Sequence, residues 1–187
     1  PISAKHTDTK VAVDGKIIKK NHTEYPKHYT VIEEHKRDPN ICELGTLYKI
    51  LKQQEIDNSD WVIFFEHLIT DKKECVTACK KSLAENINRY VIQLDVDLDV
   101  KGTNANSLEI EERYEIFKQH FPFLDGVKCV LQLSNKAGYT EHYPDRLALR
   151  VYIELDKFRD NKTLKVQLKP YSDVIDTNIY TQGRKHL

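Results

Sequence analysis

The chain has no apolar run long enough to cross a bilayer, and its first residues show no signal-peptide pattern. We therefore expect a soluble, cytoplasmic protein, in a bacterial or host-cell interior, without a membrane partner. It has no surplus of charge either, because 29 Lys and Arg residues balance 29 Asp and Glu residues. Net charge therefore does not favour a nucleic-acid or lipid partner. Methionine is absent. We therefore expect that the chain was processed, was cut from a larger protein, or lacks residues that were modified.

Cysteine is sparse and unpaired in the sequence. Cys42, Cys75, Cys79 and Cys129 show none of the close pairing that is typical of a secreted disulfide framework. Cys75 and Cys79 are four residues apart on an expected helix, and could join His67 around a zinc ion. No CxxC pair completes a tetrahedral site, so small buried helix residues are the preferred interpretation.

With 187 residues and no internal repeat, low-complexity tract or linker, the chain fits one domain, or two small lobes that share a core. Hydrophobic periodicity and turn residues divide it into elements of both kinds. We expect helices over 42–54, 71–89 and 107–121, and strands over 11–18, 28–33, 61–65, 90–100, 127–133 and 147–155. This order predicts an α+β fold with a largely antiparallel sheet. Ser107 is the expected cap of the third helix, and Pro122 ends it.

The most informative segment is the strand 90–100 with Arg89 ahead of it, RYVIQLDVDLDV, in which aspartates alternate with apolar residues. Successive strand side chains point to opposite faces, so Asp95, Asp97 and Asp99 share one face. Converging carboxylates repel one another and are tolerated mainly when a divalent cation such as Mg²⁺ or Mn²⁺ neutralises them. The strand is therefore a candidate metal platform, and the alternative is an edge strand with a solvated acidic face.

A second informative segment is the strand 147–155 and the loop before it. Its apolar residues at odd positions face the core, which leaves Arg150 on the other face in the middle of the strand. A cation there is usually paired or bound to an anion, and a triphosphate is one such anion. Ser134, Asn135 and Lys136 could add donors for phosphate oxygens. The alternative is a structural salt bridge from Arg150 to an aspartate of the acidic strand.

The third segment, 174–187, contains an aspartate and a group of cations. Asp176 follows two apolar residues and could close a metal site from an adjacent strand, or it could be an ordinary turn aspartate. Arg184, Lys185 and His186 add positive charge. Residues 127–187 contain eleven Lys and Arg against seven Asp and Glu, a surplus of four. A basic surface beside an acidic pocket suits an enzyme that handles phosphates.

Together the three segments resemble the archaeo-eukaryotic primase superfamily, and more particularly the primase-polymerase domains of viruses, plasmids and other mobile elements. The family's hhhDhD strand is matched by VIQLDVD, its serine and basic residue on successive strands by Ser134 and Arg150, and its third aspartate by Asp176 in IDTNIYTQGR. The resemblance covers roughly 89–187. The commonest family pattern has a histidine where this chain has Arg150, but arginine can clamp phosphate bidentately. Asp99 is an extra carboxylate.

The resemblance implies a fold and a reaction. The whole chain, 1–187, would be a single catalytic domain with an N-terminal αβ lobe over 1–88 and an RNA-recognition-motif-like lobe over 89–187. It would perform template-directed nucleotidyl transfer on single-stranded DNA, as a DNA primase or polymerase that acts in replication. Asp95, Asp97 and Asp176 would be the catalytic residues and would hold two Mg²⁺ or Mn²⁺ ions.

The resemblance also implies binding roles. Nucleoside triphosphates would be held by Ser134, Lys136 and Arg150. The single-stranded template would lie along the basic C-terminal half, bound mainly through its phosphates. Such domains often precede a helicase module, which we expect downstream in the full-length protein. The residues expected to contact nucleic acid are Arg146, Arg184 and Lys185.

Two other classes stay open. A metal-dependent nuclease or origin-binding replication initiator would use the same carboxylates to hydrolyse a phosphodiester, but the chain lacks a D-E-x-K lysine, a His-hydrophobe-His pair and a persuasive catalytic tyrosine. A non-catalytic nucleic-acid-binding module normally shows aromatic residues on the open face of its sheet. Here aspartates take that position and would repel a nucleic-acid backbone without metal, so an enzyme is favoured.

Overall fold

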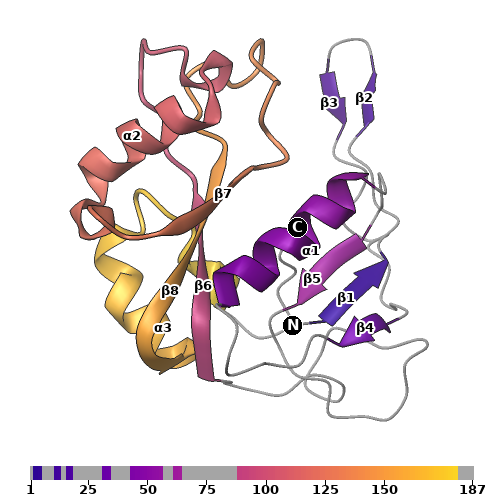
Figure 1. Ribbon diagram of the computed structural model, residues 1–187. Coiled ribbons are helices and arrows are strands. Elements are labelled where there is room, and N and C mark those ends of the chain that lie inside the picture. The colour runs from indigo at the N-terminus through magenta and orange to yellow at the C-terminus, as the bar shows by residue number, and fades with distance from the viewer. Residues whose placement is uncertain are drawn as a thin grey trace.

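The computed structural model describes residues 43–56 and 88–180, together with the backbone of five short strands near the N-terminus. Three of these strands form an antiparallel sheet of order β4-β1-β5, and the other two form the hairpin β2–β3 (Figure 1). Their bounds are Ile2–Lys5 (β1), Val11–Val13 (β2), Lys16–Ile18 (β3), Val31–Glu34 (β4) and Trp61–Phe64 (β5). The segment 11–18, predicted as one strand, is thus two strands.

The C-terminal half is built around a three-stranded antiparallel sheet of order β6-β8-β7, with helices on both faces. The fold is therefore α+β, as predicted. The strands are β6 (Asn88–Val96), β7 (Cys129–Leu133) and β8 (Leu149–Asp160). The α-helices are α1 (Glu43–Ile56), α2 (Ile110–His120) and α3 (Asn161–Leu168), and the 3₁₀ turns are η2 (Ala105–Ser107), η3 (Pro122–Leu124), η4 (Lys169–Tyr171) and η5 (Thr177–Tyr180).

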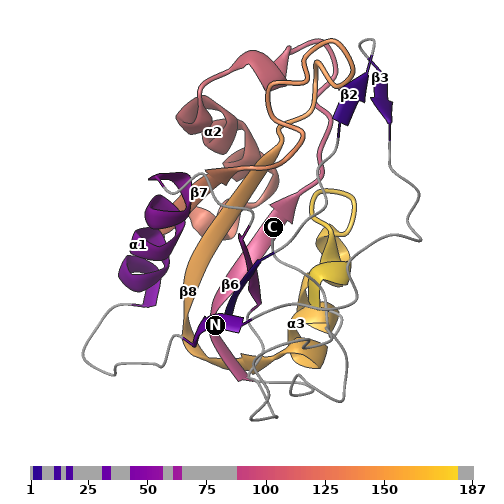
Figure 2. The ribbon, with the colours of Figure 1, turned by 90° about the vertical axis from the view of Figure 1, so that its right-hand side faces the viewer.

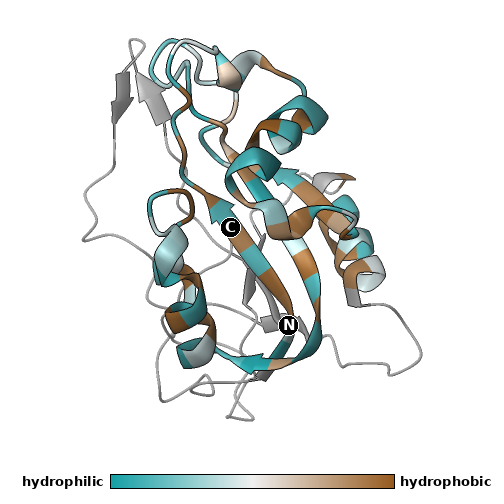
Figure 3. Cartoon of the chain, turned by 90° about the vertical axis from the view of Figure 1, so that its left-hand side faces the viewer, coloured by the Kyte–Doolittle hydropathy of each residue, from teal (hydrophilic) through white to brown (hydrophobic). Residues whose placement is uncertain are grey.

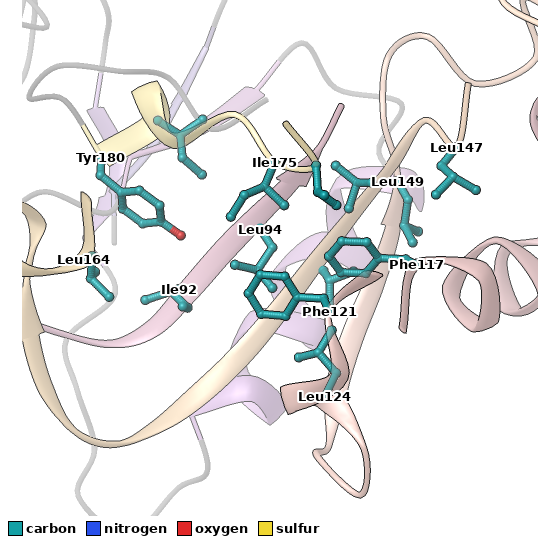
Figure 4. Packing of buried hydrophobic residues seen from close by; sticks show 14 of the residues in the cluster. Ile92, Leu94, Phe117, Phe121, Leu124, Leu147, Leu149, Leu164, Ile175 and Tyr180 are labelled. Carbon is teal, nitrogen blue, oxygen red and sulfur yellow. The ribbon is translucent and has the colours of Figure 1, made fainter. Parts of the chain in front are cut away.

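One face of the sheet β6-β8-β7 carries the main core. Alternate residues of β6 and β8 point to this face, where α2, α3 and the 3₁₀ turns pack against them. Hydropathy alternates along both strands accordingly (Figure 3). Figure 4 shows these side chains gathered between the sheet and the elements that cover it. The labelled core residues are Ile92, Leu94, Phe117, Phe121, Leu124, Leu147, Leu149, Leu164, Ile175 and Tyr180.

On the opposite face of the sheet, the helix among the described residues that packs against the strands is α1. Leu44, Leu47 and Leu51 recur at helical spacing and pack against Val91 of β6 and Tyr152 of β8. In Figure 2, α1 and α3 lie on opposite sides of β6 and β8. Burial in both clusters confirms the assignment of the two faces of β8 from its alternating sequence.

Two expectations about helix ends are corrected. The cap of α2 is Glu109, which forms a reciprocal capping box with Glu112, and not Ser107, whose hydroxyl donates to Asn104 O at 2.8 Å within η2. The helix expected over 71–89 lies outside the described residues up to 87, but Asn88 and Arg89 belong to β6. The zinc alternative at His67, Cys75 and Cys79 also falls outside the described residues.

No helix in the described part of the chain is both long and apolar enough to span a bilayer.

Candidate active site

The segment that contains Asp176 pairs with the edge of β6 that faces away from β8, beside the acidic residues. Val96 and Ile175 form an antiparallel bridge, flanked by two main-chain hydrogen bonds, from Asp97 N to Val174 O at 3.0 Å and from Asp176 N to Asp95 O at 2.9 Å. This register places Asp176 directly opposite Asp95. Opposite residues in an antiparallel pair point to the same face, so these two carboxylates share a face although 81 positions separate them in the sequence.

The pKa of Asp95 reflects the charged residues that surround it. Burial raises the pKa of Asp95 above its ordinary value of 3.8, the Arg150 guanidinium opposes this rise, and the carboxylates of Asp176 and Asp97 add to it. Two carboxylates that disfavour ionisation of a third are a cluster of like charge. Such a cluster gains most from a cation.

Arg150 lies beside Asp95 on the face of the sheet that carries α1, beyond the residues that α1 contacts. The two residues are register partners in the β6–β8 pair, and Arg150 Nε is 3.4 Å from Asp95 Oδ1. The salt bridge that the sequence left open as an alternative is therefore present. The contact is long, and although Arg150 is only 7% exposed, its Nε has no hydrogen-bond partner among the described residues. A buried guanidinium with unused donor capacity can still accept an anion.

Asp97 is surrounded by cations from the loop and segment that precede β8. Its Oδ1 atom accepts from Lys136 Nζ at 3.1 Å and from Arg146 Nη1. Arg146 Nε also lies 2.8 Å from Asp99 Oδ1, and the two residues form a β-bridge. Arg146, expected to contact nucleic acid, thus points into the acidic cluster in this structure. The extra carboxylate, Asp99, anchors it there.

Ser134 stands at the end of β7, where the loop that carries Lys136 begins. Its main-chain N donates to Ala148 O at 2.8 Å, and its Oγ accepts from Lys136 N at 3.4 Å. The Lys136 ammonium lies 5.8 Å from the centre of the Tyr143 ring. The structure therefore brings Ser134, Lys136 and Arg150 to the same end of the sheet as the aspartates.

The three aspartates are the type of residue that binds divalent cations, but their carboxylates do not converge on one point in this structure. Carboxylate oxygen is the ligand that Mg²⁺ and Mn²⁺ prefer, and the pKa of Asp95 responds to both other aspartates. Within the described residues, however, no three Asp, Glu, His or Cys side chains are close enough together to hold one metal ion. Asp97 is instead neutralised by Lys136 and Arg146. The chain's own cations thus balance part of the acidic charge.

Two further residues on the same face were not among the predicted site residues. Tyr152 and Gln132 neighbour Arg150 on β8 and β7, and Tyr152 Oη donates to Gln132 Oε1 at 2.8 Å. Burial raises the pKa of Tyr152 to about 12, so its hydroxyl stays a donor. The period of two along LQLS, which places Gln132 on the face of Ser134, is the signal that could have identified Gln132.

Three predicted site residues remain, of which two lie outside the described residues and one, Asp176, also has a local partner. Arg184 and Lys185, expected to bind nucleic acid, lie outside the described residues. Asp176 Oδ1 accepts from Asn178 N at 2.8 Å, which is the local turn role that the sequence left open. That contact uses one oxygen, so Asp176 has both a turn partner and a place opposite Asp95.

Comparisons with family models, with curated proteins and with solved structures gave no significant match to this chain. The site is therefore interpreted from its own residues and from the motif resemblance.

Proposed function

We propose that this chain is the catalytic domain of a DNA primase-polymerase of the archaeo-eukaryotic primase type, which performs metal-dependent nucleotidyl transfer on single-stranded DNA. The observation that carries the proposal is the bridge between Val96 and Ile175, which sets Asp176 opposite Asp95. Three motifs that are far apart in sequence meet at one end of one sheet. In this view the β6-β8-β7 sheet is the centre of an RNA-recognition-motif-like lobe, and the residues before it belong to an N-terminal αβ lobe.

The proposed mechanism assigns the acidic and basic side chains separate tasks. Asp95, Asp97 and Asp176 would hold the divalent cations, Mg²⁺ or Mn²⁺. When bound, two such ions would activate the attacking hydroxyl and stabilise the pyrophosphate leaving group. Arg150 and Lys136 neutralise the triphosphate of the incoming nucleotide, and the guanidinium of Arg150 supplies paired donors in a fixed plane.

This assignment implies that Asp97 would exchange its present cationic partners for a metal ion. Lys136 and Arg146 balance the Asp97 charge in the structure described. A bound cation would take over that balance, and both side chains would then be available to phosphate oxygens, Lys136 to the nucleotide and Arg146 to the template. Single-stranded DNA would lie along the basic C-terminal half with Arg184 and Lys185, and a helicase module could follow in a longer protein.

An incorporation assay separates this function from its competitors. Labelled nucleotides are offered on single-stranded DNA, with and without a primer, first with Mg²⁺ and then with Mn²⁺. We expect products longer than the primer, or new products without one, that require the template and the metal ion. Shortened template would mean a metal-dependent nuclease or origin-binding initiator, and DNA binding without products would mean a non-catalytic module. Either result would contradict the proposal.

A pair of aspartate variants ties the activity to the site. Asp95→Asn removes one charge from the cluster, whereas Asp173→Asn removes one from an exposed position just before the paired segment. We expect incorporation to be lost in the first variant and kept in the second. Equal activity in both would show that the acidic cluster is not the site of chemistry.

A further inference from the structure

A buried asparagine and arginine lie behind the proposed nucleotide site. Asn106, in η2, is 1% exposed and Arg113, in α2, is 4% exposed. Arg113 donates to Asn106 O at 2.7 Å and to Asn106 Oδ1 at 3.2 Å, and also to the carbonyls of Leu108 at 2.9 Å and Leu147 at 3.1 Å. A guanidinium bound to four oxygens in this way fixes the segments that contribute them.

The side chain of Asn106 holds the loop 134–144 at three points. Its Nδ2 atom donates to Lys136 O at 3.0 Å and to Tyr143 O at 2.9 Å, while its Oδ1 atom accepts from Gly138 N at 3.1 Å. Its main-chain N donates to Pro144 O at 2.9 Å. Both amide protons and the amide oxygen are therefore used, and they fix the start, the turn and the end of one loop.

That loop carries a cation of the proposed site. Lys136, whose carbonyl accepts from Asn106, extends its ammonium to 3.1 Å from Asp97 Oδ1. The position of the Lys136 main chain sets where the ammonium can reach. A fully satisfied buried polar network holds such a position more rigidly than surface contacts do.

We propose that Asn106 and Arg113 are positioning residues, which hold the loop 134–144 so that Lys136 meets the triphosphate beside the acidic cluster. This inference rests on the proposed function. Neither residue would touch the nucleotide, since Arg113 holds Asn106 and Asn106 holds the main chain of Lys136. They should therefore control how tightly the nucleotide binds rather than how fast a bound nucleotide reacts.

A second buried pair in the same domain provides a matched control. Arg89 Nε donates to Asn161 Oδ1 at 2.6 Å, and both residues are at least 95% buried. This pair joins the start of β6 to the start of α3, at the opposite end of β6 from Asp95. Asn161→Asp thus makes the same chemical change in a buried arginine pair that has no link to the loop.

The informative variant is Asn106→Asp. It keeps an oxygen for Arg113 and for Gly138 N, but it sets an oxygen against the carbonyls of Lys136 and Tyr143, which repels the loop. We expect the KM for the nucleotide to rise about ten-fold in incorporation assays, as for loss of one charge-assisted contact, with kcat nearly unchanged. Asn161→Asp should leave the KM unchanged. If Asn106→Asp unfolds, Arg113→Lys, which keeps the charge but loses the fork, carries the same test.

A double-mutant cycle separates positioning from a purely structural role. If Asn106 acts through Lys136, adding Asn106→Asp to Lys136→Ala should raise the KM no further than Lys136→Ala alone. Additive effects, or an unchanged KM in Asn106→Asp, would overturn the positioning role while the proposed function stands. An inactive wild-type protein would overturn the proposed function itself, so the two failures are distinguishable.

Discussion

The two faces of the β6-β8-β7 sheet are made by the same strands and behave in opposite ways. On one face, Leu94 and Val151 are register partners and both are completely buried in the main core. On the other, the next register pair is Asp95 and Arg150, which lies beyond the residues that α1 packs against. Burial of the first pair stabilises the fold, whereas burial of the second leaves a carboxyl with a raised pKa and a guanidinium with an unused donor. It is at this charged end of the sheet that we place the proposed site.

The largest expected difference between the faces is in activity. Asp95→Asn should lower incorporation by about a thousand-fold or more, since metal-held charge is worth several kcal/mol in such a transition state. Its free energy of unfolding should not fall, because the change relieves repulsion from Asp97 and Asp176. Incorporation rates and urea denaturation check the two parts. A variant that loses stability along with activity would erase the contrast between the faces.

Leu94→Ala tests the apolar face. The side chain is fully buried, so its truncation should lower the free energy of unfolding by about 2–5 kcal/mol. Incorporation per folded molecule should stay close to that of the unmodified protein, because Leu94 points away from the site. Denaturation measures the free energy of unfolding, and an incorporation assay at a temperature where the variant remains folded measures the activity. A specific loss of activity in the folded variant would mean that the two faces are coupled.

Arg150→Ala decides between the two roles of this arginine. If it clamps the triphosphate, the KM for the nucleotide should rise by about ten-fold or more, and template affinity should change less. Arg150→Lys is the control, since it keeps the charge and loses the planar fork. Nucleotide KM and DNA affinity are measured on both. A lower melting temperature with an unchanged KM would assign Arg150 to the salt bridge with Asp95 alone.

The pH dependence of stability should differ between the unmodified protein and Asp95→Asn. Because the pKa of Asp95 is raised on folding, this group favours the folded state below its unfolded pKa, and that contribution is lost as the pH rises through the folded pKa. The free energy of unfolding of Asp95→Asn, relative to the unmodified protein, should therefore increase with pH over this window above 3.8. Urea denaturation across the acidic range measures it, and a constant difference would show that Asp95 is not perturbed.

The smallest expected effect is that of Tyr152→Phe, at the border between the covered and open parts of the polar face. The change removes the hydrogen bond to Gln132 and should cost about 1 kcal/mol of stability. Chemical denaturation checks this value. A large loss of incorporation would instead extend the proposed site to Tyr152, and the border would have to move.

Local patterns in the sequence predicted much of this architecture. The alternation along 147–155 identified both faces of β8, and the apolar stripe that ends at Phe121 identified α2. The boundaries were less accurate where side chains compete. Glu109 displaced Ser107 as the cap of α2 because only Glu109 has a reciprocal partner three residues on, in Glu112.

The site depended on longer-range information. The residues themselves made Asp95 and Asp97 candidates and left Asp176 open between a metal site and a turn, whereas its place opposite Asp95 follows from a pairing across 81 positions. Asn106 escaped notice because nothing in its local sequence distinguishes a surface amide from one that fixes a distant loop. Strand register and buried polar contacts belong to the tertiary structure, and periodicity does not encode them.

Binding of Mn²⁺ to the purified domain, followed by electron paramagnetic resonance, tests the central claim most directly. Asp176→Asn keeps the contact with Asn178 but removes the charge opposite Asp95. We predict that it weakens Mn²⁺ binding by at least about ten-fold, and that Asp173→Asn leaves it unchanged. Equal Mn²⁺ affinity in Asp176→Asn and the unmodified protein, or no Mn²⁺ binding by the unmodified protein, would contradict a metal site assembled by the pairing of this segment with β6.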